Sequence, residues 1–201
     1  RDQALAVFHR KLAEQSRLFP LLFIFETAFR AYVAARLETI YSTDDWWKPI
    51  EAEILAQRDP MALSTLNGVR APRPMLRTVD HILREAATAG RHTFSTGYDV
   101  VAAGTMAHVG RLIDQHWTEM ASAFNPVHKS RPQGRMTSFE FRQHFTLVRE
   151  ARNDLYHHRV VSRQKRVMEV IEELISMLDL DVGEVYADIV AAPLDPLPFR
   201  Q

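Results

Sequence analysis

Apolar residues recur at helical spacing through nearly the whole chain, and the strict alternation that is typical of strands is scarce. The most apolar stretch, Phe19 to Phe25, continues into a helical pattern that reaches Tyr41, and Pro20 stands where a first helical turn accepts proline. We therefore expect an all-α fold, a helical bundle in which this segment is the central helix.

Turn and cap residues divide the rest of the chain. A turn is expected at Asn67-Gly68, Gly90 should end a helix over 74–89, and Ser138 should cap a long helix from Phe139 to His158. Asp44 and Asp45 suit the start of a short or bent helix before Trp46. The other expected helices cover residues 2–16, one or two segments within 95–123, 164–180 and 182–191.

The length of 201 residues suits one domain with a sizeable core. No repeat and no domain boundary are visible, so residues 1–201 are expected to form a single helical domain. Its core should span about residues 20–180, and residues 192–201 should form a proline-rich tail that is not helical.

The composition excludes several kinds of protein. The absence of cysteine excludes disulfides and thiolate metal sites and suits a reducing compartment. No signal peptide is recognisable, and no apolar run approaches the length of a membrane span, because Glu26 and Arg30 interrupt the longest one. We expect a cytoplasmic protein with no membrane contact.

Motifs for metals, cofactors and protein nucleophiles are missing. The chain has no His-Glu-x-x-His motif, no phosphate-binding glycine loop and no nucleophile elbow. Glu140 and His144 could seat a metal on one helix face, but no third ligand stands at a suitable spacing. We expect neither a metal nor a cofactor.

The net charge of zero conceals two blocks of opposite sign. Residues 129–166 hold ten Lys and Arg against three acidic residues, whereas residues 167–199 hold eight acidic residues and no Lys or Arg. The basic block can bind a polyanion. The two blocks can equally form neighbouring helices that pair with each other, with acidic and basic partners at helical spacing: Glu169, Glu172 and Glu173 facing Arg159, Arg163 or Arg166.

Residues 151–159 (ARNDLYHHR) contain the side chains most suited to catalysis. Arg152 and His157 lie about 140° apart around a helix and about one and a half turns along it. If the helix bends or ends here, Arg152, Asn153 and His157 can converge on one small anion. A guanidinium that holds a phosphate and an imidazole that moves protons near neutral pH suffice for metal-free cleavage of RNA, because RNA supplies its own 2′-hydroxyl as the attacking group.

Other interpretations of the motif stay open. His158 also fits the loose spacing, and both histidines could simply belong to an exposed basic helix face. Tyr156 should pack beside the motif. Arg111 and His116 have the same spacing as Arg152 and His157, but they stand in an apolar, amphipathic stretch and should decorate a packed helix. Large aromatics elsewhere should lie in the core or at an interface and not act as platforms for bases: Trp46, Trp47 and Trp117.

The ARNDLYHHR segment resembles the Arg-Asn-x-x-x-His-His signature of the Abi-like abortive-infection proteins, which belong to the HEPN superfamily of helical ribonucleases and RNA-binding domains. Three other segments are similar to that family's pattern and occur in the expected order: FETAFR (25–30), FSTGYDVV (94–101) and the stretch from Trp117 to Phe124. The resemblance spans about residues 20–180, and only the motif itself is specific. A tryptophan-rich and proline-rich insert at about 42–74 departs from the family.

The resemblance implies a HEPN-like helical bundle with extra helices that acts as a homodimer, with two copies of the motif forming one composite site. It implies metal-independent endoribonuclease activity that leaves a 2′,3′-cyclic phosphate. It also implies a toxin, phage-exclusion or CRISPR-associated context, in which an antitoxin or CRISPR-type protein can be a partner.

Residue roles follow from the same resemblance. Arg152 would contact the scissile phosphate, His157 would act as general acid or base, and Asn153 would orient His157 or the phosphate. Glu26 and Arg30 would support the site, although an ion pair between residues one turn apart also explains them. Basic residues outside the motif are candidates for guiding the RNA backbone: Lys129, Arg131, Arg135, Arg149 and Arg159.

Two different functions remain as alternatives. HEPN-like bundles also serve as catalytically silent modules that bind RNA or a partner protein, and a purely structural dimerisation domain of a larger protein is the third interpretation. A silent module should bind RNA through Arg152 without turnover.

Overall fold

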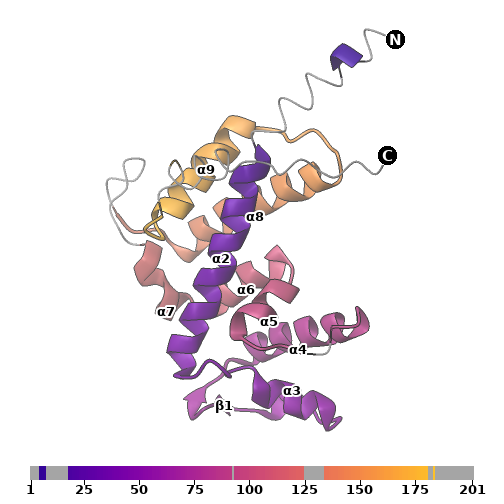
Figure 1. Ribbon diagram of the computed structural model, residues 1–201. Helices are drawn as coiled ribbons and strands as arrows, with labels where there is room; N and C mark the ends of the chain where they lie inside the picture. Colours follow the sequence, from indigo (N-terminus) through magenta and orange to yellow (C-terminus); the bar gives the residue numbers. More distant parts are fainter. Residues whose placement is uncertain (1–4, 8–17, 92, 125–133, 181–182, 184–201) are drawn as a thin grey trace.

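The computed structural model describes residues 5–7, 18–91, 93–124, 134–180 and 183. Within this part of the chain the protein is an all-α bundle, and a two-residue-per-strand hairpin supplies the only sheet. The expected fold class is confirmed. Helix α2 (Leu18–Tyr41) runs the length of the bundle, with α8 and α9 beside its N-terminal half and α3 and α4 near its C-terminal end (Figure 1).

The remaining elements follow in chain order: α3 (Lys48–Leu55), the 3-10 helix η1 (Pro60–Ala62), β1 (Thr65–Leu66), β2 (Val69–Arg70), α4 (Arg73–Thr88), α5 (Gly97–Ala103), α6 (Met106–Gln115), α7 (Trp117–Met120), the 3-10 helix η2 (Ala121–Phe124), α8 (Ser138–Tyr156) and α9 (Gln164–Ser176).

Helix α2 is the central helix, as its apolar sequence predicted. It packs against α5, α6, α8 and α9, and one of its faces is lined by fully buried aromatic and aliphatic side chains such as Phe29 and Leu37. Its 24 residues and a mean hydropathy of 1.5 over its most apolar window also meet the length and composition of a membrane span. The expectation that no segment reaches that length is therefore wrong, although core helices of helical bundles meet the same two criteria.

Aromatic rings fill the centre of the bundle. Phe29 on α2 lies 5.4 Å from Phe145 and 6.2 Å from Phe141, both on α8, and Phe124 stacks on Trp117 with ring centroids 5.5 Å apart. Trp46 and Trp47 are each 1% exposed, and Trp117 is half-buried. The prediction that the tryptophans are core or interface aromatics is confirmed. This packing fixes the position of α8 relative to α2.

Several helix limits differ from those that the sequence predicted. The N-cap of α8 is Thr137, in a capping box with Glu140, and not Ser138. Asp44 and Asp45 do not start a helix before Trp46, because α3 begins after Trp47. The C-terminal limits also move, since α8 ends at Tyr156 and α9 at Ser176. The stretch 95–123 holds more breaks than expected, and the expected helices at 2–16 and 182–191 and the tail lie almost wholly outside the described residues.

The predicted turn at Asn67-Gly68 is confirmed and closes the hairpin. Asn67 and Gly68 both have positive φ, 48° and 79°, which is the backbone of a type I′ turn. Thr65 pairs with Arg70 across the two strands. The sequence pattern missed these strands because each has only two residues. The end of α4 before Gly90 agrees with the prediction to within one residue.

Candidate functional site

The carboxylate of Glu26 lies between two arginines from distant parts of the chain. Its Oε1 accepts a hydrogen bond from Arg30 Nη2 at 2.7 Å, and its Oε2 accepts one from Arg152 Nε at 3.2 Å. Arg30 is one turn further along α2, whereas Arg152 comes from α8, 126 residues after Glu26. The ion pair that the spacing predicted is present, and the same carboxylate also holds the arginine of the motif.

Arg30 is a buried cation, 9% exposed, and both of its Nη atoms are hydrogen-bonded. Its Nη1 donates to the carbonyl oxygens of Val101 at 2.6 Å, Ala102 at 3.1 Å and Gly104 at 2.7 Å, at the end of α5. The last carbonyls of a helix lack intrahelical partners and carry partial negative charge. Arg30 satisfies them, and so ties α5 to α2 and to Glu26.

The guanidinium of Arg152 is bound by Glu26 at Nε and lies with one face on the ring of Tyr156, whereas its Nη2 atom has no hydrogen-bond partner among the described residues. Its guanidinium carbon lies 4.0 Å from the centre of the Tyr156 ring, and Nη1 donates weakly to Asn153 Oδ1 at 3.4 Å. The side chain is 31% exposed, and Nη2 makes no hydrogen bond to any residue that the structure describes. The prediction that Tyr156 packs beside the motif is confirmed; Phe19 on α2 packs against the same ring at 5.3 Å.

The motif crosses the end of α8. His157 is the C-cap, and His158 takes the left-handed conformation with φ 56°, where glycine is the usual residue. Arg159 N–H donates to Asp154 O at 2.7 Å and His158 N–H to Leu155 O at 3.1 Å, the two bonds of a Schellman motif. The helix therefore ends within the motif. A bend or an end of the helix at this place was the condition under which Arg152, Asn153 and His157 could converge.

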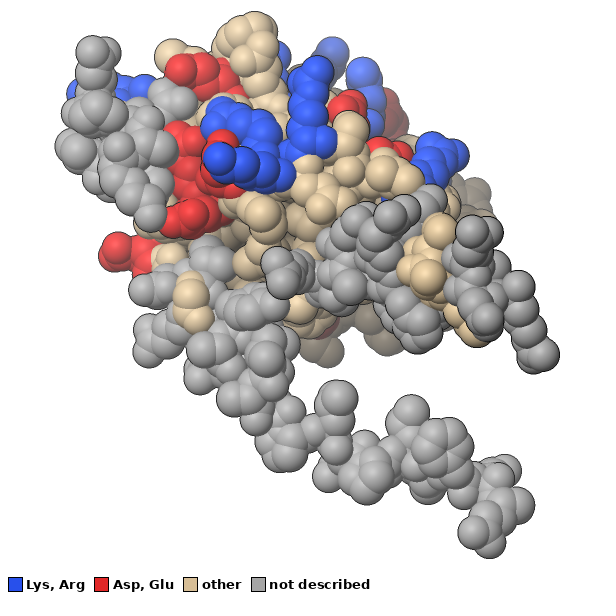
Figure 2. All heavy atoms as spheres, turned by 90° about the horizontal axis from the view of Figure 1, so that it is seen from above, with Lys and Arg blue, Asp and Glu red and all other residues tan. Residues whose placement is uncertain are grey.

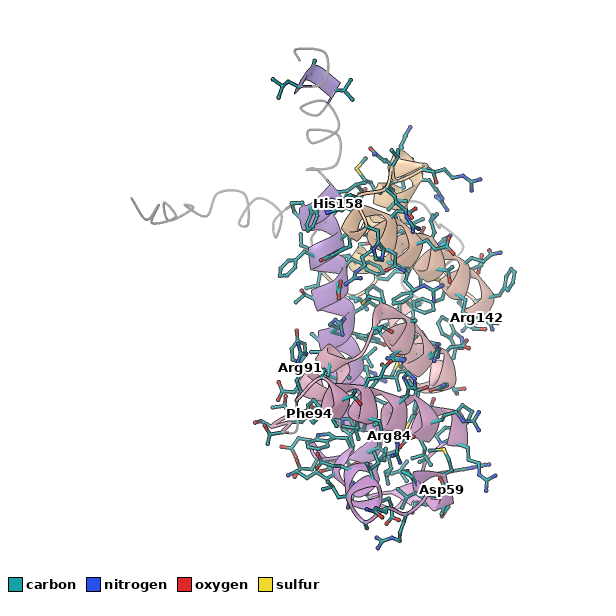
Figure 3. All side chains as sticks on the ribbon, turned by 90° about the vertical axis from the view of Figure 1, so that its right-hand side faces the viewer. Asp59, Arg84, Arg91, Phe94, Arg142 and His158 are labelled. Carbon is teal, nitrogen blue, oxygen red and sulfur yellow. The ribbon has the colours of Figure 1, made fainter. Side chains whose placement is uncertain are left out.

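The structure brings the side chains of Arg152 and Asn153 together, but neither His157 nor His158 joins them. The side chains of His157 and His158 are exposed, and in the described part of the chain they form no hydrogen bond or ion pair. Both imidazoles stand at the same end of α8 as Arg152, near the N-terminal half of α2, where Figure 3 labels His158. One copy of the chain thus presents a positioned cation and two unengaged imidazoles.

The candidate RNA-guiding residues fall into three groups. Arg149 is half-buried and lines a pocket between α6 and α8. Arg135 and Arg159 are exposed, and Arg159 Nη1 lies 3.9 Å from Asp154 Oδ1. Lys129 and Arg131 lie outside the described residues.

The described parts of the basic and acidic blocks, which include α8 and α9, lie side by side at one end of the molecule. Figure 2 shows Lys and Arg adjoining Asp and Glu on the face seen from above. Of the predicted pairs, Arg166 and Glu169 approach to 3.5 Å, but both belong to α9. Between helices, Glu173 on α9 faces His144 on α8 at 3.8 Å. Pairing of the two blocks is therefore present in part.

His116, which shares the spacing of the motif, is a core residue. It is 2% exposed; its Nδ1 donates to Leu112 O at 3.2 Å, and its Nε2 accepts from the Tyr41 hydroxyl at 2.9 Å. Burial raises the pKa of Tyr41, so the hydroxyl stays protonated and donates. Arg111 is exposed. The prediction that this pair decorates a packed helix is confirmed.

The buried histidines should make stability depend on pH. Burial lowers the pKa of His116 and of His108 from the ordinary 6.5, so both are neutral in the folded protein while the unfolded chain takes up protons. The free energy of unfolding should therefore be highest above pH 6.5 and fall below it, by up to about 1.4 kcal/mol per pH unit for each histidine. Urea denaturation at a series of pH values measures this slope. It should become shallower in His116→Gln, and an unchanged slope in that variant would contradict the assignment.

Another cluster of metal-ligand side chains lies on α4 and α6. Ligand atoms of His81, Glu85 and His108 all lie within 4.8 Å of one another. However, His108 Nδ1 accepts the Thr105 N–H at 3.2 Å in a capping box, so the neutral ring carries its proton on Nε2 and has no free lone pair. We assign His108 a capping role. Glu140, which the sequence suggested as a metal ligand together with His144, already has another role, because its side chain closes the capping box of α8.

Comparisons with protein-family models, with curated proteins and with solved structures found no match.

Proposed function

We propose that the protein is a metal-independent endoribonuclease of the HEPN superfamily, of the Abi-like kind, and that it acts in the cytoplasm as a toxin or phage-defence effector. The observation that carries the proposal is the position of Glu26. Its carboxylate binds Arg152 Nε and leaves the edge between Nη1 and Nη2 with a single weak hydrogen bond, from Nη1 to Asn153 at 3.4 Å. That edge is the one that binds two oxygens of a phosphate.

The meeting of distant segments supports the family assignment. Glu26 and Arg30 belong to FETAFR, Val101 to FSTGYDVV and Arg152 to ARNDLYHHR, three of the segments that resemble the Abi-like pattern. Arg30 contacts Val101 and Glu26, and Glu26 contacts Arg152, so these segments share one connected polar cluster. Short matches that arose by coincidence have no reason to be in contact.

The chemistry requires no group beyond the RNA and these side chains. The 2′-oxygen attacks phosphorus as a histidine takes its proton, the bond from phosphorus to the 5′-oxygen breaks, and a protonated histidine supplies a proton to the leaving oxygen. A 2′,3′-cyclic phosphate and a 5′-hydroxyl result. Arg152 stabilises the charge that develops on the phosphate, and His157 at the helix end is the proposed acid or base.

A second copy of the chain would complete the site. One copy offers exposed imidazoles that contact no described residue, whereas the reaction needs a base and an acid on opposite sides of one phosphate. Exposed aromatic rings adjoin the site, with Phe19 46%, Phe23 58% and Tyr156 43% exposed, and such rings are enriched at protein interfaces. We therefore propose a homodimer across this face.

The test is cleavage of an end-labelled RNA pool in excess EDTA. The wild type should cut and leave cyclic-phosphate ends, and His157→Ala should lose at least about 100-fold of the rate, as is typical for a general acid or base. The control variant His81→Ala changes another exposed histidine, on α4, and should cut like the wild type. His158→Gly, which suits the left-handed position, shows whether the second histidine is needed. Cleavage that requires a divalent metal would overturn the proposal.

The exposed state of both histidines favours one alternative, a catalytically silent module that binds RNA. It predicts that Arg152→Ala weakens RNA binding and that no variant has turnover. Binding without cleavage by a folded, dimeric wild type would establish this alternative.

A further inference from the structure

A pocket of about 150 Å³ opens between α6 and α8, with Arg111 and Asp114 on one wall and Arg142 and Arg149 on the other. It is smaller than the roughly 300–1,000 Å³ of pockets that enclose drug-sized ligands. It therefore has room for a single small group and not for a whole nucleotide. Its lining predicts that this group is an anion.

The charges in the pocket are unbalanced. Arg142 Nε lies 3.5 Å from Asp114 Oδ1, and the two side chains are 55% and 38% exposed. Arg111 and Arg149 form no hydrogen bond or ion pair with any residue in the described ranges. Three guanidinium groups thus surround one carboxylate, and two of them have all their donors available. Arginine is the side chain best suited to phosphate, because its planar guanidinium can donate two parallel hydrogen bonds to two phosphate oxygens.

The packing of α6 on α8 makes the pocket rigid. A Cβ atom at Gly110 would lie 2.9 Å from the ring of Phe145, so only glycine allows this ring to lie against α6. Phe145 is 4% exposed and Phe141 1% exposed, and both rings line the pocket. The arginines therefore stand around a fixed, largely apolar floor, and the charge of the half-buried Arg149 is screened less by salt than a fully exposed charge.

The pocket and the candidate site share one face of α8. Phe145, Arg149, Arg152 and Tyr156 are spaced by four, three and four residues, which places them in a single helical stripe. Arg149 precedes Arg152 by three residues, about 4.5 Å along the helix axis. Figure 3 shows Arg142 and His158 toward opposite ends of α8, so a strand laid along this helix would pass from the site to the pocket.

We infer that the α6–α8 pocket binds a backbone phosphate of single-stranded RNA next to the one held by Arg152. This inference rests on the proposed function for its substrate. An acidic protein segment is the other macromolecule that such a pocket could bind. The stripe on α8 favours RNA, because it joins the pocket to a phosphate site on the same helix.

The test measures the binding of short, fluorescein-labelled single-stranded RNA of mixed sequence by anisotropy. The full chain carries His157→Ala, so that the RNA stays intact. Adding Arg111→Gln and Arg149→Gln should raise Kd at least about tenfold, since two charge-assisted contacts are lost. The slope of log K against log salt should become shallower by about 0.7, the value for one phosphate of a single strand.

A double variant with the same change of charge is the control. Arg58→Gln with Arg84→Gln removes two exposed arginines, one just after α3 and one on α4, that pair with Glu53 and Asp80. It should leave the salt slope within error of the parent. The inference would be overturned if both double variants changed Kd and the salt slope equally. It would also be overturned if the pocket variant changed neither while its melting temperature matched that of the parent. Cleavage is measured separately on chains that retain His157. If these chains do not cleave RNA but the pocket variant still weakens RNA binding, the proposed function is wrong and the pocket inference stands.

Discussion

Arg30→Met should lower the free energy of unfolding by about 3–5 kcal/mol, the usual cost of breaking a buried, hydrogen-bonded ion pair. The substitution keeps a side chain of similar length but removes the partner of three carbonyl oxygens at the end of α5. It also deprives Glu26 of its nearer cation. These groups are shielded from water and have no replacement partner, so their desolvation is no longer offset.

Arg84→Met is the matched control. Arg84 and Asp80 are also four residues apart on a helix and also approach to 2.7 Å, but the side chain of Arg84 is 54% exposed, against 11% for Arg30. Exposed pairs contribute at most about 1 kcal/mol, so this variant should unfold near the wild-type urea concentration. Figure 3 shows Arg84 far from His158, near the other end of the bundle. Equal effects of the two variants would mean that burial of the Arg30 cluster does not matter.

Arg152→Lys should lower kcat/KM for RNA cleavage by about 100-fold, even though it keeps the positive charge. An ammonium cannot donate to the Glu26 carboxylate at one edge and at the same time offer two parallel donors to a phosphate at another. It also loses the stacking of a planar group on Tyr156. Removing a single well-placed donor to a developing oxyanion costs about 10²–10³ in rate.

Arg58→Lys is the control for this substitution. Arg58 also binds a glutamate through Nε, at 2.7 Å to Glu53, but it is 63% exposed and stands just after α3. Its replacement should leave cleavage unchanged. Because Arg152 is partly exposed, Arg152→Lys should change the free energy of unfolding by less than about 1 kcal/mol, so a stability loss cannot mimic the kinetic effect. Full activity in Arg152→Lys would show that only the charge is needed.

Local signals account for the elements that were predicted well. Pro74 and Gly90 mark the ends of α4 because proline fits a first helical turn and glycine fits the left-handed position after a last one. The apolar run of α2 predicted a central helix. The end of α8 was missed because His158, not a glycine, takes the left-handed conformation there.

The candidate site was predictable only as separate pieces. The sequence indicated Arg152, Asn153 and His157 as a motif, and the spacing of Glu26 and Arg30 predicted an ion pair within one helix. Only the family resemblance implied that Glu26 and Arg30 support the site of Arg152. No local pattern indicated that the two pieces touch, because they are separated by 126 residues. Nor did the sequence indicate that Arg30 binds the end of α5.

By itself the sequence determined what depends on a few neighbouring residues. These features are the all-α fold, the central helix, the turn at Asn67-Gly68 and the presence of side chains of the kind that can bind a phosphate. Tertiary structure alone decided which of those side chains meet. The reason is physical, since helical periodicity and capping act within about four residues, whereas the Glu26–Arg152 contact and the arginine pocket depend on how α2 and α6 pack against α8. That packing is set by rings such as Phe29 and Phe145 and by the missing Cβ of Gly110.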